Sequence, residues 1–183
     1  EAKEKLEKGL AVWIREGSVA KDLDALIPLL NSTTSPFIGF CTDDRNPLDI
    51  SKEGHIDYLI RKSIEKGVPV EIAYRSASWS VANHYGIDRG PSRVGALAPG
   101  YRADIVILKD PKTCEISEVF SNGKRVSQLD WPSSQSISFE NSIQATVPET
   151  QDLEGPKGQI HCIQVIPGKI ITGRKVCSSS LPE

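Results

Sequence analysis

Two adjacent carboxylates, Asp43 and Asp44, follow a short apolar run and are the residues whose types most clearly suggest chemistry. The run, residues 37–41, reads FIGFC, which has the length and composition of a buried strand. A doubled carboxylate at the rim of such a strand is costly unless something positive binds it, and a divalent metal is one such partner. The alternative is local: both aspartates cap the next helix and pair with Arg45, as is common in turns. On spacing alone, the local interpretation is the better one.

A second polar rim follows the apolar run 10–14, where Arg15 and Glu16 end the sequence LAVWI. Side chains at the carboxyl ends of parallel strands gather at one edge of a sheet, where barrel enzymes place their catalytic groups. We therefore expect Arg15 and Glu16 to help line the same mouth as Asp43. A structural ion pair is an equally good interpretation of these two residues.

The elements needed to position these rims alternate between strands and helices. Amphipathic spacing and capping residues indicate the helices, and β-branched apolar runs indicate the strands. In order, we expect a helix end at 1–8, a strand at 10–14, a helix at 19–30, a strand at 37–41 and helices at 51–66 and 69–85. This order is typical of a parallel sheet or barrel.

The pattern becomes all-β after Gly90. A strand is expected at 103–108, and Asn122-Gly123 predicts a hairpin within the following strands. Residues 127–158 are rich in Ser, Gln, Pro and Glu, which is typical of a linker, and the last strands should turn at Pro167-Gly168. The expected division is a barrel portion at 1–90, β-sandwich strands at 91–126, a linker at 127–158 and the start of a C-terminal domain at 159–183.

Composition narrows the function classes. The 183 residues carry 22 Lys plus Arg against 24 Asp plus Glu, a net charge of -2, so no basic surplus indicates a nucleic-acid partner. The apolar runs are too short for a membrane span, and no signal peptide is visible, which favours a cytoplasmic protein. The four cysteines lack CxxC spacing and are expected as reduced thiols. The chain contains no Met and opens inside a helical pattern, so we expect it to be a fragment.

Four segments together resemble the amidohydrolase superfamily of metal-dependent hydrolases, and more narrowly its adenine deaminase family. They are REGSVAKDLDALIPLL, CTDDRNPLDI, EGHIDYLIRKSIEKGV and GALAPGYRADIVIL. The resemblance implies an α/β plus β fold. The chain would be the C-terminal fragment of a (β/α)8 barrel with its last two strands and helices, part of a small β-sandwich and the start of a C-terminal domain.

The resemblance also implies roles for the two rims. Asp43, the first Asp after the Thr that ends the last barrel strand, would bind a divalent metal, Mn2+ or Fe2+, and shuttle a proton. Asp44, Glu16 and Arg15 would contact the substrate. Metal-activated water would attack C6 of adenine to give hypoxanthine and ammonia. The expected partner is this small molecule, with no nucleic acid and no membrane, and a homo-oligomer is left open.

The remaining metal ligands of that family are missing from this sequence. They would include a His-x-His pair, whereas the histidines here are His55, His84 and His161, expected on helix faces or in a late strand. One Asp cannot hold a catalytic metal, so we expect the chain alone to be inactive. Two alternatives stay open: another amidohydrolase acting on a purine or cyclic amide, and a non-catalytic binding or assembly module.

Overall fold

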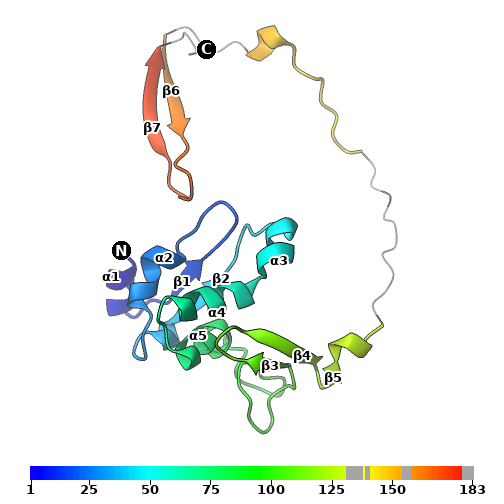
Figure 1. Cartoon of the computed structure of the whole chain (residues 1–183). Helices are drawn as coiled ribbons and strands as arrows, with labels where there is room; N and C mark the ends of the chain where they lie inside the picture. The colour runs from blue at the N-terminus through cyan, green and yellow to red at the C-terminus, as the bar shows by residue number, and fades with distance from the viewer. Residues whose placement is uncertain (131–137, 139–140, 154–157, 179–183) are drawn as a thin grey trace. The chain divides into compact units, whose positions relative to one another are not determined.

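The computed structural model describes residues 1–130, 138, 141–153 and 158–178. The chain divides into a first unit, residues 1–129 with 167–170, and a second unit, residues 130–166 with 171–183. Strands in the described ranges form sheets of two, three and two strands, none of which closes into a barrel (Figure 1). The predicted mixture of α/β and all-β structure is therefore confirmed, whereas the barrel fragment and the β-sandwich stay predictions.

A parallel pair of strands forms the centre of the first unit. Strand β1 (Val12–Arg15) pairs with β2 (Ile38–Cys41) in a register that places Val12 beside Ile38 and Arg15 beside Cys41. Helix α1 (Ala2–Glu7) precedes β1, and Gly9 ends it with a left-handed φ of 77°. Both strands predicted from the apolar runs are confirmed, although each begins one or two residues later than expected.

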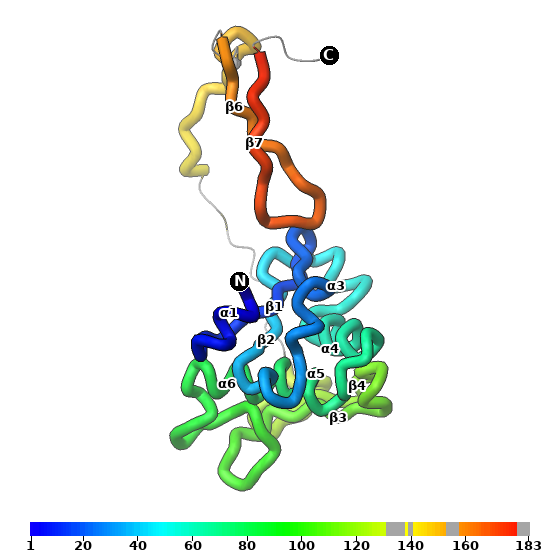
Figure 2. The backbone as a smooth tube through the Cα atoms, turned by 90° about the vertical axis from the view of Figure 1, so that its left-hand side faces the viewer, coloured from blue at the N-terminus to red at the C-terminus, as the bar shows by residue number. Residues whose placement is uncertain are grey.

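The two faces of this pair differ in what covers them. Val12 and Ile14 are buried together with Ile38 and Phe40, on the side where α4 (Ile56–Glu65) and α5 (Val70–Ala77) pack (Figure 2). On the other face, the Trp13 ring covers Gly39 so closely that an added Cβ would lie 1.6 Å from a ring carbon. A side chain at position 39 would therefore displace the ring.

The helix predicted at 19–30 is wrong in its first turn. Helix α2 spans only Leu23–Leu26 and continues as a 3₁₀ turn at Ile27–Leu29. Residues 16–22 instead form a tight loop, in which the Gly17 N–H donates to the Ala20 carbonyl and the Asp22 N–H to the Arg15 carbonyl. These backbone bonds hold the loop beside the end of β1 and delay the helix.

The helix predicted at 51–66 is also wrong as a single element. Helix α3 (Pro47–Glu53) starts earlier, with Asn46 as its N-cap, and α4 follows after a break at Gly54 and His55. Gly54 has a φ of 105°, and an added Cβ would lie 2.2 Å from an Asp57 carboxylate oxygen, so only glycine suits the break. The helix predicted at 69–85 is likewise divided at Ser78, between α5 and α6 (Trp79–His84).

An antiparallel sheet follows these helices in the first unit. Its strands β3 (Ile105–Asp110), β4 (Glu115–Ser121) and β5 (Lys124–Arg125) pair in chain order. The turn at Asn122 and Gly123 has φ of 48° and 77°, the left-handed pair that a tight hairpin requires. The hairpin predicted from Asn-Gly is confirmed, and the strand predicted at 103–108 lies two residues later.

The second unit contains one antiparallel hairpin. Strand β6 (Gln159–Gln164) pairs with β7 (Gly173–Ser178), which confirms the two late strands predicted from β-branched residues. Of the predicted linker, the described residues include only 3₁₀ turns at Val126–Gln128 and Thr150–Leu153 as regular structure. Residues 131–137, 139–140 and 154–157 lie outside the described ones, and the predicted domain boundaries stay predictions.

Candidate functional site

The carboxyl ends of β1 and β2 bring Arg15 and Asp43 into direct contact. The Arg15 guanidinium donates through Nη1 to Asp43 Oδ2, and the Asp43 side chain is 55% exposed. Arg15 lies on the same face of β1 as Trp13, against which His84 of α6 packs, and its side chain is 18% exposed. The hydrogen bond that Arg15 donates to Asp43 raises the pKa of Arg15, which stays charged.

Asp43 also has an unusual backbone. Its φ is 51°, a left-handed conformation that non-glycine residues adopt rarely, although Asp tolerates it better than most. Such conformations persist where the surrounding structure imposes them, and they gather at functional sites. In the described part of the chain, Oδ1 of Asp43 has no hydrogen-bond partner, so one oxygen is held by Arg15 and the other is available.

Asp44 points to the loop that follows β1. Its Oδ2 accepts a hydrogen bond of 2.9 Å from the Val19 N–H. Oδ1 lies over Gly17, where an added Cβ would approach it to 1.6 Å. Asp44 therefore links the loop after β1 to the loop after β2 through this hydrogen bond. Its contact with substrate stays a prediction.

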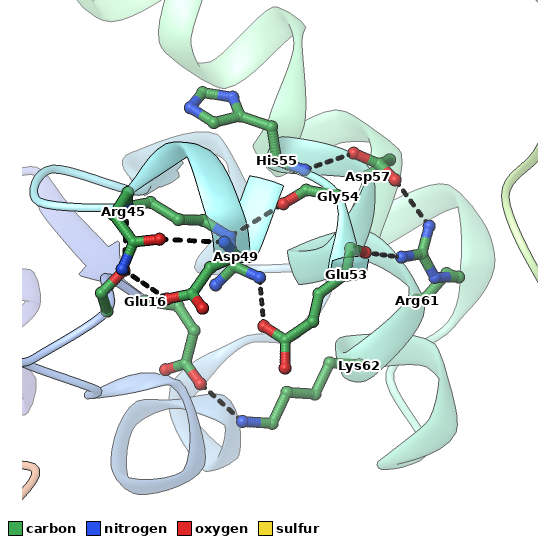
Figure 3. Close-up of polar contacts among 11 residues, drawn as sticks. Glu16, Arg45, Asp49, Glu53, Gly54, His55, Asp57, Arg61 and Lys62 are labelled. Atoms are coloured by element: carbon green, nitrogen blue, oxygen red, sulfur yellow. Dashed lines mark hydrogen bonds and ion pairs between the residues drawn. The ribbon is translucent and has the colours of Figure 1, made fainter. Parts of the chain in front are cut away.

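Glu16 lies on the opposite face of β1 from Arg15. Its side chain is fully buried, with Oε1 2.5 Å from Lys62 Nζ on α4 (Figure 3). Its Oε2 accepts a hydrogen bond from the Leu23 N–H at 3.1 Å. Burial disfavours the charge of Lys62, but the hydrogen bond and charge of Glu16 outweigh it and raise the pKa of Lys62. Both carboxylate oxygens thus have structural partners, and the predicted substrate contact of Glu16 stays a prediction.

The local interpretation of the aspartate pair is wrong in both of its contacts. Arg45 pairs with Glu53 instead, and its Nε donates to the Gly54 carbonyl at 2.8 Å (Figure 3). The Arg45 guanidinium also lies 4.3 Å from the centre of the Tyr58 ring. Asn46, not an aspartate, caps α3 by accepting from the Asp49 N–H at 2.9 Å. Asp43 and Asp44 are therefore left for other contacts.

His55 was predicted on a helix face, but it contacts the residue that follows strand β2. It lies in the break before α4, where its Nε2 is 2.8 Å from the hydroxyl of Thr42, the residue before Asp43. Its own N–H donates to Asp57 at 2.7 Å, and Asp57 pairs with Arg61 (Figure 3). The helix-breaking character of Gly54 was the one signal that could have located His55 in a loop.

Asp43 offers one carboxylate oxygen of the kind that ligates divalent metals. Among the residues that the structure describes, no three His, Cys, Asp or Glu side chains gather closely enough to hold an ion. The available Oδ1 of Asp43 suits a hard divalent cation, and a catalytic site needs about three protein ligands. The described residues thus fit only part of such a centre.

The chain belongs to the amidohydrolase family. The model of that family matches residues 3–126, which include both strand ends. Among curated proteins, the chain is 51% identical to the adenine deaminase of Gluconobacter oxydans over 178 residues, which are 94% of this chain and 31% of the relative. The adenine deaminases of Methylobacterium nodulans and Bdellovibrio bacteriovorus are 47% and 43% identical, with 94% of this chain and 31% and 30% of each relative covered. The chain thus spans about a third of the length of these relatives.

Proposed function

We propose that this chain forms part of an adenine deaminase, which converts adenine and water to hypoxanthine and ammonia. The observation that carries the proposal is the 51% identity to an adenine deaminase across 94% of the chain, both strand ends included. The adenine deaminases of Gluconobacter oxydans, Bdellovibrio bacteriovorus and Rhizobium etli, at 51%, 43% and 42% identity, all support this assignment. A single strand-end carboxylate would not distinguish deaminases from other amidohydrolases, so the substrate is inferred from the relatives.

We further propose that β1 and β2 are the last strands of a (β/α)8 barrel. In the described residues, no third strand pairs with either of them, so each has an unpaired edge. Purely parallel sheets are normally larger and covered on both faces, and a two-stranded one is incomplete by that standard. Further barrel strands at these edges would also bring the other metal ligands to the mouth where Asp43 lies. By the same comparison, β3, β4 and β5 would belong to a small β-sandwich.

Asp43 would act at the reacting water through its Oδ1. A divalent metal, for which Mn2+ or Fe2+ is proposed, supplies when bound a more acidic water and charge stabilisation. Oδ1 would ligate this ion and accept the proton that water loses as its oxygen attacks C6 of adenine. The same oxygen would return the proton to the leaving nitrogen, which departs as ammonia.

Arg15 would position this carboxylate, because it occupies Oδ2 and leaves Oδ1 directed elsewhere. Arg15 and Asp44 are also proposed to contact the substrate, and the direct contact of Arg15 with Asp43 supports the proposal for Arg15. Glu16 is proposed with them, although its buried contacts favour support of the strand. A homo-oligomer stays an open prediction.

The test uses a protein that carries this chain together with the upstream barrel strands. Ammonia release would be measured with adenine and guanine, and ring opening with a cyclic amide such as dihydroorotate, each with added Mn2+ or Fe2+. The expected result is rapid release from adenine alone. Rapid ring opening of the cyclic amide with no turnover of adenine would reject the proposal in favour of another amidohydrolase activity.

A further inference from the structure

Two cysteine thiols face each other across the β6–β7 hairpin of the second unit. The register pairs Cys162 with Lys175 and Ile160 with Cys177, so both cysteines lie on one face as diagonal neighbours. Their sulfur atoms are 3.4 Å apart, with Cys162 donating its S–H to Cys177. The two sulfur atoms are therefore already in contact in the reduced hairpin.

The hairpin around this pair is short and has little other support within its unit. It has six paired positions, and an isolated two-stranded hairpin is marginally stable in water. On the opposite face, Arg174 donates through Nε to His161 Nδ1 at 3.2 Å, a second diagonal contact. Both faces thus bring diagonal neighbours together, as expected for a strongly twisted two-stranded ribbon.

We propose that Cys162 and Cys177 are a modification site, at which a low-molecular-weight disulfide oxidises them to an intrachain disulfide. One thiol loses its proton and attacks the small disulfide, so that a mixed disulfide forms and one small thiolate leaves. The second cysteine, also deprotonated, attacks the sulfur of the first and releases the second small thiolate. The two cysteines lose two protons and two electrons, and the small disulfide is reduced to two thiols.

The contact between the thiols also determines how this reaction depends on pH. The hydrogen bond to Cys177, followed by burial, raises the pKa of Cys162. Because the thiolate is the nucleophile, a raised pKa lowers the reactive fraction at neutral pH. The rate of closure should therefore rise with pH through the alkaline range.

The other two cysteines provide matched controls on the same chain. Cys114 is buried, with 5% of its surface exposed, and burial raises the pKa of Cys41. Within the described residues, no sulfur-to-sulfur contact other than that of Cys162 with Cys177 is present. The oxidant should therefore distinguish the hairpin pair from Cys41 and Cys114.

The test exposes the 183-residue chain to oxidised glutathione at pH 8, then counts free thiols after unfolding and maps linked peptides. The expected result is a fall from four free thiols to two, with Cys162 and Cys177 in one linked peptide pair. Cys162→Ser and Cys177→Ser should each retain a glutathione adduct on the remaining hairpin cysteine, and Cys41→Ser should close the hairpin as the unmodified chain does. Hydrogen exchange of the β6 and β7 amides should slow at least tenfold after oxidation.

Four remaining thiols, or links that join different chains or involve Cys41 or Cys114, would overturn the proposal. Stable glutathione adducts on both hairpin cysteines of the unmodified chain would overturn it as well, because they would show that the second attack cannot occur. None of these outcomes depends on deaminase activity, so the proposal can fail without affecting the proposed function.

Discussion

The buried ion pair between Glu16 and Lys62 should be the polar contact on which the first unit depends most. Replacing Glu16 by Ala leaves the N–H of Leu23, a residue that is fully buried, without its acceptor. A buried donor without a partner costs about 1–3 kcal/mol, and the lost buried methylene groups add about 1 kcal/mol. Lys62 is 22% exposed and keeps Asp24 at 3.7 Å, so its own loss is small. We expect the free energy of unfolding to fall by about 3 kcal/mol, near the lower end for breaking a buried pair.

The assay is urea unfolding of the chain, followed by tryptophan fluorescence at neutral pH. With a denaturant slope of about 2 kcal/mol per M, the expected loss lowers the midpoint by about 1.5 M. Glu16→Gln keeps the shape of the side chain and one acceptor oxygen, so it should lose about half as much. The matched control is Asp24→Asn, which removes the 64%-exposed second partner of Lys62 and should change stability by less than about 0.5 kcal/mol.

The same pair gives the prediction a pH dependence. Although burial disfavours the charged form, Glu16 raises the pKa of Lys62 above its ordinary value of 10.5. A raised pKa in the folded state means that this stabilisation is complete below pH 10.5 and is lost as the pH rises through the folded value. The difference between the unmodified chain and Glu16→Ala should therefore shrink above pH 10.5. A cost of Glu16→Ala no larger than that of Asp24→Asn, or a difference that grows at alkaline pH, would show that the buried pair does not stabilise the first unit in this way.

Two further perturbations test the packing and charge around the same strands. Gly39→Ala should lower the free energy of unfolding by about 1–3 kcal/mol, since its Cβ would lie 1.6 Å from the Trp13 ring; unchanged stability and Trp fluorescence would show that the ring does not cover this glycine. Burial raises the pKa of Asp57, but the hydrogen bond from Arg61 helps to outweigh burial and leaves it below the ordinary 3.8. Its stabilisation should be present above pH 3.8 and lost as the pH falls through the lowered value, so the cost of Asp57→Asn, measured by urea unfolding, should vanish in acid. A cost that persists below pH 2 would contradict this.

The strands were predictable because their apolar runs are bounded abruptly by charge. Val12 and Ile14 are buried as such a run requires, and strand alternation could have placed Glu16 with them on the helix side. The helix break at Ser78 was not predictable from periodicity, because apolar spacing continues across it. At Gly54 the break coincides with a left-handed φ of 105°, and Arg45 and Arg61 donate hydrogen bonds to the Gly54 and Glu53 carbonyls there. Hydrophobic patterns do not encode these tertiary bonds.

The candidate site shows the same limit. The polar residues at the ends of β1 and β2 could be located from the sequence, because they directly follow apolar runs. The partners could not, because Arg45 was expected to bind neighbouring aspartates and instead binds Glu53 and the Gly54 carbonyl across α3. The contact between Arg15 and Asp43 depends on the parallel register, which brings residues 28 positions apart together.

The most direct test of the central claim replaces Asp43 by Asn in a protein that includes the upstream barrel strands. If Asp43 ligates the metal and moves the proton, adenine deamination should fall at least 1,000-fold, an amount typical of about 4 kcal/mol at the transition state, and the bound metal should decrease. Asp24→Asn, the same chemical change at an exposed position, should leave the rate within about twofold, since exposed ion pairs contribute little. A folded Asp43→Asn protein that keeps its metal and deaminates adenine at the unmodified rate would contradict the account.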